Sequence, residues 1–333
     1  MSLQAHGPQF TFAHRMYRLW CVWNSIVTYH NAIGPQNAAA GYAGPAQNAP
    51  QQQQGAAPLG LPPGLNHAPQ LRQTFLRDAV QASTLFMPTP AIVFQPQHIS
   101  SFGFFNHTQW TCYVNSFHFN ANAITYGQFL KLCGTIYHEV RHAEQFYRIA
   151  QGLSGGLLTF PDLSADRLLR AMGQANTVQN TVNRFQAAVG GGQGAMTAGM
   201  VANLMAIPNN VAQSASNNAR ASFTAYVRLG VPRWFKRRTA QEEVEDWLQA
   251  QYSTAGQAAQ PNNAMLHANA RYHNNNVRPN NVFAMYESHP MERDSFAIEA
   301  SVTAMIAGQI NVPAQQGGIQ QRNGNLFNHL PNR

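Results

Sequence analysis

Apolar residues recur with helical spacing over residues 126–151, which form the most strongly patterned stretch of the chain. They lie around much of the circumference of the predicted helix: Phe129, Leu130, Leu132, Cys133, Ile136, Tyr137, Val140, Ala143, Phe146, Tyr147, Ile149 and Ala150. A helix that is apolar on most sides is buried among other elements. The pattern therefore predicts a central, buried helix.

Weaker helical patterns lie on both sides of this stretch. Residues 10–30 form an aromatic-rich amphipathic helix, which we expect to dock on the main domain rather than on a partner. Thr239 and Glu242 form a capping box before a helix that reaches about residue 252. A last helix begins at Pro290, with His289 as its N-cap, and runs to about residue 307. Further candidate helices span residues 161–172, 174–189, 195–206 and 219–229.

Strand patterns come before the central helix. Residues 91–94 are a short candidate, and residues 102–105 and 110–120 are rich in aromatic and β-branched residues. A turn at Asn106-His107-Thr108 separates the last two, which predicts an antiparallel hairpin. We therefore predict an α+β fold with a small antiparallel sheet and a helix-rich body.

Composition divides the chain into segments. Residues 31–70 consist largely of Ala, Gln, Gly, Pro and Asn and cannot bury enough apolar surface to order themselves, which predicts a flexible linker or arm. An N-terminal amphipathic segment (1–30) precedes it, and the main domain (71–310) follows. This domain includes a helical insertion at about 153–280, and residues 311–333 form a C-terminal tail.

Charged residues make up only 10% of the chain, and the net charge of +8 reflects a scarcity of acids. The one basic-aromatic run, residues 233–238, is interpreted as a solvated loop, so there is no strong signal of nucleic-acid binding. Three widely spaced cysteines form neither a disulfide framework nor a CxxC site. No apolar run reaches membrane-spanning length, and the N-terminus lacks the pattern of a secretory signal.

The central helix carries the sequence His138-Glu139-Val140-Arg141-His142, a HExxH motif. Two histidines one turn apart can bind one Zn²⁺ and leave positions for a third ligand and a water. Glu139 can then accept the proton of that water. The alternative is a pair of solvated histidines on an exposed helix. Since polar residues on a buried helix are paired or bound to something, the metal is favoured.

The last helix offers the third ligand. Glu292, in its first turn, is our first choice, although an acid there also complements the helix macrodipole without a metal. Asp294 is the second choice, and it could instead accept a ring N–H from a zinc-bound histidine. Tyr286 and His289, just before this helix, are candidate hydrogen-bond donors to a developing oxyanion. Arg141 is expected to pair with an acid.

Residues 137–145, Tyr-His-Glu-Val-Arg-His-Ala-Glu-Gln, resemble the active helix of zincin metallopeptidases. Their HExxH-A-E-Q form is similar to the metallopeptidase domains of bacterial polymorphic toxins and of cargo carried by contractile injection systems. Residues 286–295 resemble the Tyr…Pro-x-Glu-x-Asp-Ala segment of such domains, with Ser295 in place of alanine. The resemblance covers about residues 90–152 and 282–308. It implies a gluzincin-type site with His138, His142 and an acid as ligands and Glu139 as general base.

These features together predict a zinc-dependent endopeptidase, a bacterial effector or toxin that cleaves a protein or peptide substrate. We expect the strand at 111–119 to hold the substrate backbone beside the metal by β-addition. The resemblance implies export by a delivery particle or a dedicated secretion apparatus, since no signal peptide is recognised. The alternative is a non-catalytic structural or interaction protein, such as particle cargo or a lumen component, that retains a zinc site. Low charge and richness in Asn, Gln and Ala would suit that role.

Overall fold

The computed structural model describes residues 7–32, 68–96, 102–116, 126–158, 195–229, 239–253, 256 and 288–311. These residues form helices and a small three-stranded sheet, which confirms the predicted α+β class. The helices are α1 (Gly7–Ala32), α2 (Ala68–Ser83), α4 (Tyr126–Ser154), α7 (Ala198–Met205), α8 (Asn209–Ser216), α9 (Ala219–Leu229), α10 (Ala240–Tyr252) and α14 (Pro290–Asn311). The strands are β1 (Ala91–Gln95), β2 (Gly103–Asn106) and β3 (Thr111–Asn115).

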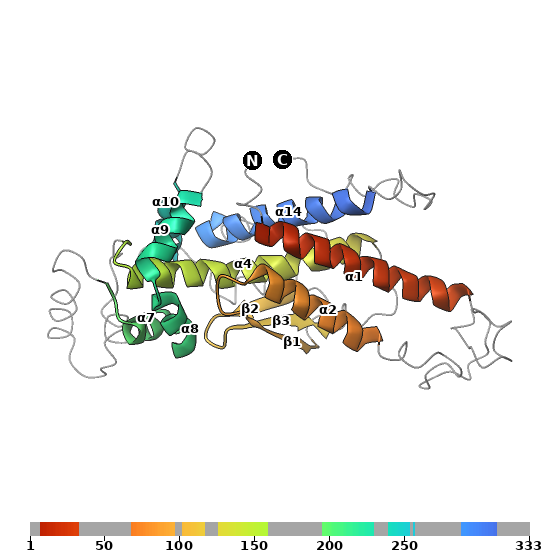
Figure 1. Cartoon of the computed structure of the whole chain (residues 1–333), viewed down its shortest axis with the longest axis horizontal. Coiled ribbons are helices and arrows are strands. Elements are labelled where there is room, and N and C mark those ends of the chain that lie inside the picture. Colours follow the sequence, from red (N-terminus) through yellow and green to blue (C-terminus); the bar gives the residue numbers. More distant parts are fainter. Residues whose placement is uncertain are drawn as a thin grey trace, which may run out of the picture.

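Helix α4 is the central element, as its apolar pattern predicts. It runs through the middle of the molecule with α14 along one side and the sheet along the other (Figure 1). Helices α7 to α10 pack around its C-terminal half. The two long helices α4 and α14 are antiparallel: Gln145 contacts Met291, whereas Gly134 faces Thr303. This arrangement brings two segments far apart in the chain into contact along several turns.

The sheet has the strand order β1-β3-β2. The predicted hairpin of β2 and β3 is confirmed, and Asn106 closes its turn by accepting hydrogen bonds from the backbone N–H groups of Thr108 and Gln109. However, β1 pairs with β3 in parallel, so the prediction of an antiparallel sheet is wrong for this strand. The alternation of apolar residues along a strand does not determine its direction, which depends on where the chain enters the sheet.

Strand β3 is the middle strand, and both of its edges are paired over Thr111–Asn115. A peptide cannot be added to a strand whose backbone groups already bond two neighbours, so the expectation that this strand holds the substrate is wrong for these residues. Residues 117–119 of the predicted strand lie outside the described residues. The edge strand that faces α4 is β2.

The N-terminal helix docks on the main domain, as predicted. Phe12, Met16 and Leu19 are completely buried, and the Phe12 ring lies 4.8 Å from the ring of Tyr137 on α4. The capping box at Thr239 is also confirmed. Helices α2 and α8 were not predicted. The α8 sequence, rich in Asn, Gln and Ser, has weak helix propensity, but the helix packs against α4 and buries Val211, Ala212 and Ala215.

Several predicted segments lie outside the described residues. These are the candidate helices at 161–172 and 174–189, the basic run at 233–238, most of the predicted linker at 31–70 and almost all of the tail at 311–333. Among the described helices, none combines the length and the hydropathy that crossing a lipid bilayer requires. In the same part of the chain, Cys112 and Cys133 are buried free thiols.

Candidate metal centre

Three side chains that could hold a metal ion meet between α4 and α14. His138 and His142 lie one turn apart on α4, and their Nε2 atoms are 3.2 Å apart. Glu292, in the first turn of α14, places Oε2 3.2 Å from His138 Nε2 and Oε1 3.4 Å from His142 Nε2. One ligand atom of each residue lies within 4.8 Å of the others. The folded chain thus brings the HExxH histidines and one acid of the last helix to a single point.

The far side of each imidazole also has a polar neighbour. His142 Nδ1 is 2.9 Å from Oε1 of Gln145, and Ser295 Oγ is 3.4 Å away from the same nitrogen. His138 Nδ1 lies 3.2 Å from Glu299 Oε2, at ion-pair distance although not aligned as a hydrogen bond. Such neighbours orient the rings of metal-binding histidines and raise their basicity. Both Nε2 atoms therefore remain directed at Glu292.

Glu139 lies between this group and the sheet. Its Oε2 accepts a hydrogen bond of 2.8 Å from the backbone N–H of Phe105 on β2. Burial is the main cause that raises the pKa of Glu139, and the negative charge of Glu292 adds to it, whereas His142 and His138 lower it. The residue as a whole is half-buried. It is therefore a proton acceptor of increased basicity, held against the edge strand.

The electrostatic field of the cluster favours positive charge. Burial lowers the pKa of His138, but the carboxylates of Glu292 and Glu299 outweigh it and raise that pKa to about 10. Burial also opposes charge on His142, and the carboxylate of Glu292 again raises its pKa. The pKa of Glu292 is held well below its usual range, because His142 and His138 outweigh the effect of burial. Together with Glu139, three acids surround two imidazoles, and this is an environment that stabilises a cation.

Asp294 lies outside this group. Its carboxylate accepts hydrogen bonds from Arg141, at 2.7 Å from Nε and 3.3 Å from Nη2, and from Gln145 Nε2 at 2.8 Å. Residues two apart on a helix point to different sides, so Glu292 and Asp294 cannot both face the histidines. The structure therefore corrects both roles predicted for Asp294, since Gln145 and Glu299 are the neighbours of the ring nitrogens. Arg141 pairs with acids, as expected.

Of the two predicted oxyanion donors, His289 is described and Tyr286 is not. The His289 side chain is half-buried just before α14. Burial lowers its pKa, a hydrogen bond to the Ala250 carbonyl raises it, and the charges of Glu292 and His142 act on it as well. His289 is thus part of the surroundings of the centre and is turned toward α10.

Sequence reasoning missed three members of this environment: Gln145, Glu299 and Phe105. Two of them carried a signal. Gln145 follows His142 by three residues and Glu299 follows Glu292 by seven, so each shares a helix face with a ligand. Phe105 had none, because its contribution is a backbone N–H that only the position of β2 brings to Glu139.

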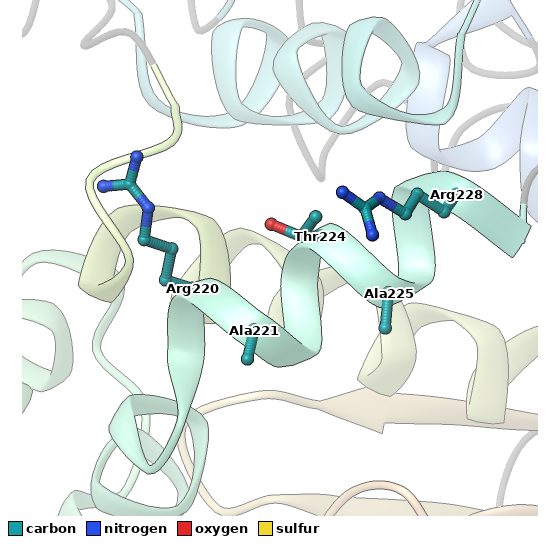
Figure 2. A pocket seen from close by; sticks show the side chains of 5 residues that line it. All are labelled: Arg220, Ala221, Thr224, Ala225 and Arg228. Carbon is teal, nitrogen blue, oxygen red and sulfur yellow. The ribbon is translucent and has the colours of Figure 1, made fainter.

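A separate cavity of about 700 Å³ lies along α9. Figure 2 shows Arg220, Thr224 and Arg228 in a row on one side of this helix, and two alanines complete the lining. The cavity includes none of the residues described above. The histidine cluster is the candidate site, because ionisable groups from separate elements converge there, whereas the α9 cavity is lined by one exposed helix surface.

No protein-family model, no curated protein and no solved structure matches this chain. Function is therefore inferred from the side chains that meet between α4 and α14 and from the strand beside them.

Proposed function

We propose that this protein is a zinc-dependent endopeptidase. The observation that carries the proposal is the meeting of the two HExxH histidines with Glu292, a residue 154 positions after His138. Ligands about 2.0–2.1 Å from a tetrahedral zinc lie roughly 3.3 Å from one another. The two Nε2 atoms are 3.2 Å apart, which agrees with that spacing, and the two oxygens of Glu292 lie against them, Oε2 at 3.2 Å from His138 Nε2 and Oε1 at 3.4 Å from His142 Nε2. The resemblance of residues 137–145 to toxin metallopeptidases extends the proposal to a bacterial effector.

The donor set favours a catalytic zinc over a structural one. Structural sites have four protein ligands, whereas catalytic sites have three and leave one position open. Among the residues that the structure describes, two imidazoles and one carboxylate are the ligands brought together here. When bound, zinc polarises a carbonyl oxygen and lowers the pKa of water toward neutrality.

Glu139 is the proposed general base. It lies next to a ligand in the chain, and burial raises its pKa. The Phe105 N–H holds one of its oxygens at 2.8 Å and so orients the carboxylate. The other oxygen accepts the proton of the attacking water, and the same carboxyl then donates a proton to the leaving amine.

The substrate backbone is proposed to lie along β2. This strand forms an edge of the sheet, and the Phe105 N–H is directed to Glu139 rather than to β3. An extended peptide added to such an edge gains backbone hydrogen bonds and lies beside the general base. This placement replaces the one expected on β3.

The Glu139→Gln variant tests the proposal. Glutamine keeps the size of the side chain and an acceptor for the Phe105 N–H, but it cannot take up a proton. We expect the zinc-loaded protein to hydrolyse unfolded casein, and the variant to keep about one zinc per chain while its turnover falls by roughly 10²–10⁴-fold. Glu243→Gln, in the first turn of α10, is the matched control and is expected to retain full turnover.

Two results would overturn the proposal. One is hydrolysis that survives in the Glu139→Gln variant. The other is an unaltered protein that holds zinc and cleaves no peptide bond across a degenerate peptide library, the behaviour expected of a non-catalytic interaction protein.

A further inference from the structure

Gln145 lies between the two helices that supply the metal centre, and it is completely buried. It follows His142 by one turn of α4. Its Oε1 lies 2.9 Å from His142 Nδ1. Its Nε2 donates to the backbone carbonyl of Met291 at 2.9 Å and to Asp294 Oδ2 at 2.8 Å, and it lies 3.3 Å from Ser295 Oγ. One amide thus contacts a ligand on α4 and the first turns of α14.

These contacts determine which way the amide points. The Met291 carbonyl and the Asp294 carboxylate can only accept hydrogen bonds, so the group facing them must be the NH₂. Exchanging the amide oxygen and nitrogen would place oxygen against oxygen at both positions. The amide oxygen therefore faces His142.

The orientation of the amide in turn determines the tautomer of His142. An amide oxygen is an acceptor only, so the hydrogen bond requires a hydrogen on His142 Nδ1. In a neutral imidazole the other nitrogen then carries the lone pair. That nitrogen is Nε2, which faces His138 and Glu292. A metal ion bound between the histidines and Glu292 needs this tautomer, because it requires a lone pair on Nε2.

We infer that Gln145 is a positioning residue of the metal centre with two linked effects. Its oxygen fixes His142 in the Nδ1–H tautomer, and its NH₂ group docks the turn of α14 that carries Glu292. Met291, Asp294 and Ser295 lie on both sides of Glu292 in the chain, so the three contacts set the position of the third ligand. The inference rests on the proposed metal site but not on peptide hydrolysis.

The test compares Gln145→Leu with Gln151→Leu. Both residues are buried glutamines of α4, at 0% and 3% exposure. Gln151 lies about two turns after Gln145 on the helix, and it accepts a hydrogen bond from Arg148. It is therefore a matched control for losing a buried amide. Gln145→Glu adds a third arm, because it keeps an oxygen near His142 and places a carboxylate against Asp294.

Two quantities are measured on each protein without substrate. The ¹⁵N spectrum of metal-free, selectively labelled protein at alkaline pH gives the His142 tautomer, and competition with a chelator gives the zinc dissociation constant. We expect Nδ1–H in the unaltered protein and in Gln151→Leu, with equal zinc affinity. We expect Gln145→Leu to lose that tautomer preference and to bind zinc about 10–100-fold more weakly. Gln145→Glu should keep the tautomer and still lose affinity, because α14 is displaced.

Wild-type affinity with the Nδ1–H tautomer in Gln145→Leu would overturn the inference. If that variant does not fold, the unaltered protein still decides, since an Nε2–H tautomer of His142 there contradicts the argument. A protein that shows these tautomer and affinity effects but cleaves no peptide ends the endopeptidase proposal and leaves the role of Gln145 intact.

Discussion

Alanine substitution of the two acids at the start of α14 should have different main effects: Asp294→Ala should cost more stability, and Glu292→Ala should weaken zinc binding more. Asp294 accepts two hydrogen bonds from the Arg141 guanidinium and one from Gln145. The side chains of Arg141 and Asp294 are only 10% and 22% exposed. Removing one partner of a buried ion pair costs about 3–5 kcal/mol, because the other charge stays buried. Asp294→Ala should therefore destabilise the fold.

The expected loss lies at the lower end of that range, at about 3 kcal/mol. Arg141 keeps Glu144 as a partner and keeps its position over the Trp247 ring, 5.3 Å from the ring centre. Glu292→Ala removes the partner of His138 and His142 and no contact with this arginine. It should cost less stability, because an imidazole left without its carboxylate can release its proton, whereas a guanidinium stays charged. It should instead weaken zinc by more than the roughly 10–100-fold typical of residues that only orient a ligand.

Urea unfolding of the metal-free variants, followed by circular dichroism, gives the stability change, and chelator competition gives the zinc dissociation constant. A double-mutant cycle with Arg141→Ala isolates the energy of the Arg141–Asp294 pair. A loss of less than about 1 kcal/mol in Asp294→Ala, or a larger loss of zinc affinity there than in Glu292→Ala, would contradict these roles of the two acids.

Three further predictions concern the packing of α4 against α14, the binding of zinc and the exposed face of β2. A methyl group at Gly134 would lie 2.8 Å from Thr303 Oγ1 and 2.9 Å from Glu299 Cγ. Overpacking costs about 1–3 kcal/mol, which exceeds the ~1 kcal/mol gained in helix propensity. Gly134→Ala should therefore lower the urea midpoint and weaken zinc binding. Zinc at a hundred times its dissociation constant should add about 2.7 kcal/mol of stability, seen as a melting temperature that falls with a chelator, and His142→Ala should abolish this response. Phe104 is 43% exposed and stacks on Tyr113 on the outer face of the sheet. For peptides that place an aromatic residue beside Phe104, Phe104→Ala should raise KM with little change in kcat. An unchanged KM would contradict binding of the substrate along β2.

The elements predicted best are those whose signals lie within a few neighbouring residues. The apolar pattern of 126–151 locates α4, and the capping box at Thr239 locates the start of α10. The sequence did not predict helix α8 or the direction of β1, because both depend on contacts with distant segments of the chain. An eight-residue helix with weak propensity is stabilised by burial against α4, and a parallel strand pairing joins segments that are separated in sequence.

The residues of the metal centre also fall into two groups, those that one helix places together and those that only the tertiary structure brings to it. The spacing of His138, Glu139 and His142 is a property of one helix, so the sequence alone places these side chains together. The sequence favoured Glu292 over Asp294 but could not settle the choice, because both are acids in the first turns of α14 and the choice depends on which side of α14 faces α4. Docking of the two helices made that choice and also brought Gln145, Glu299 and the Phe105 N–H to the site. Helical periodicity acts over one or two turns, whereas the contact between segments 154 residues apart depends on packing of the whole core.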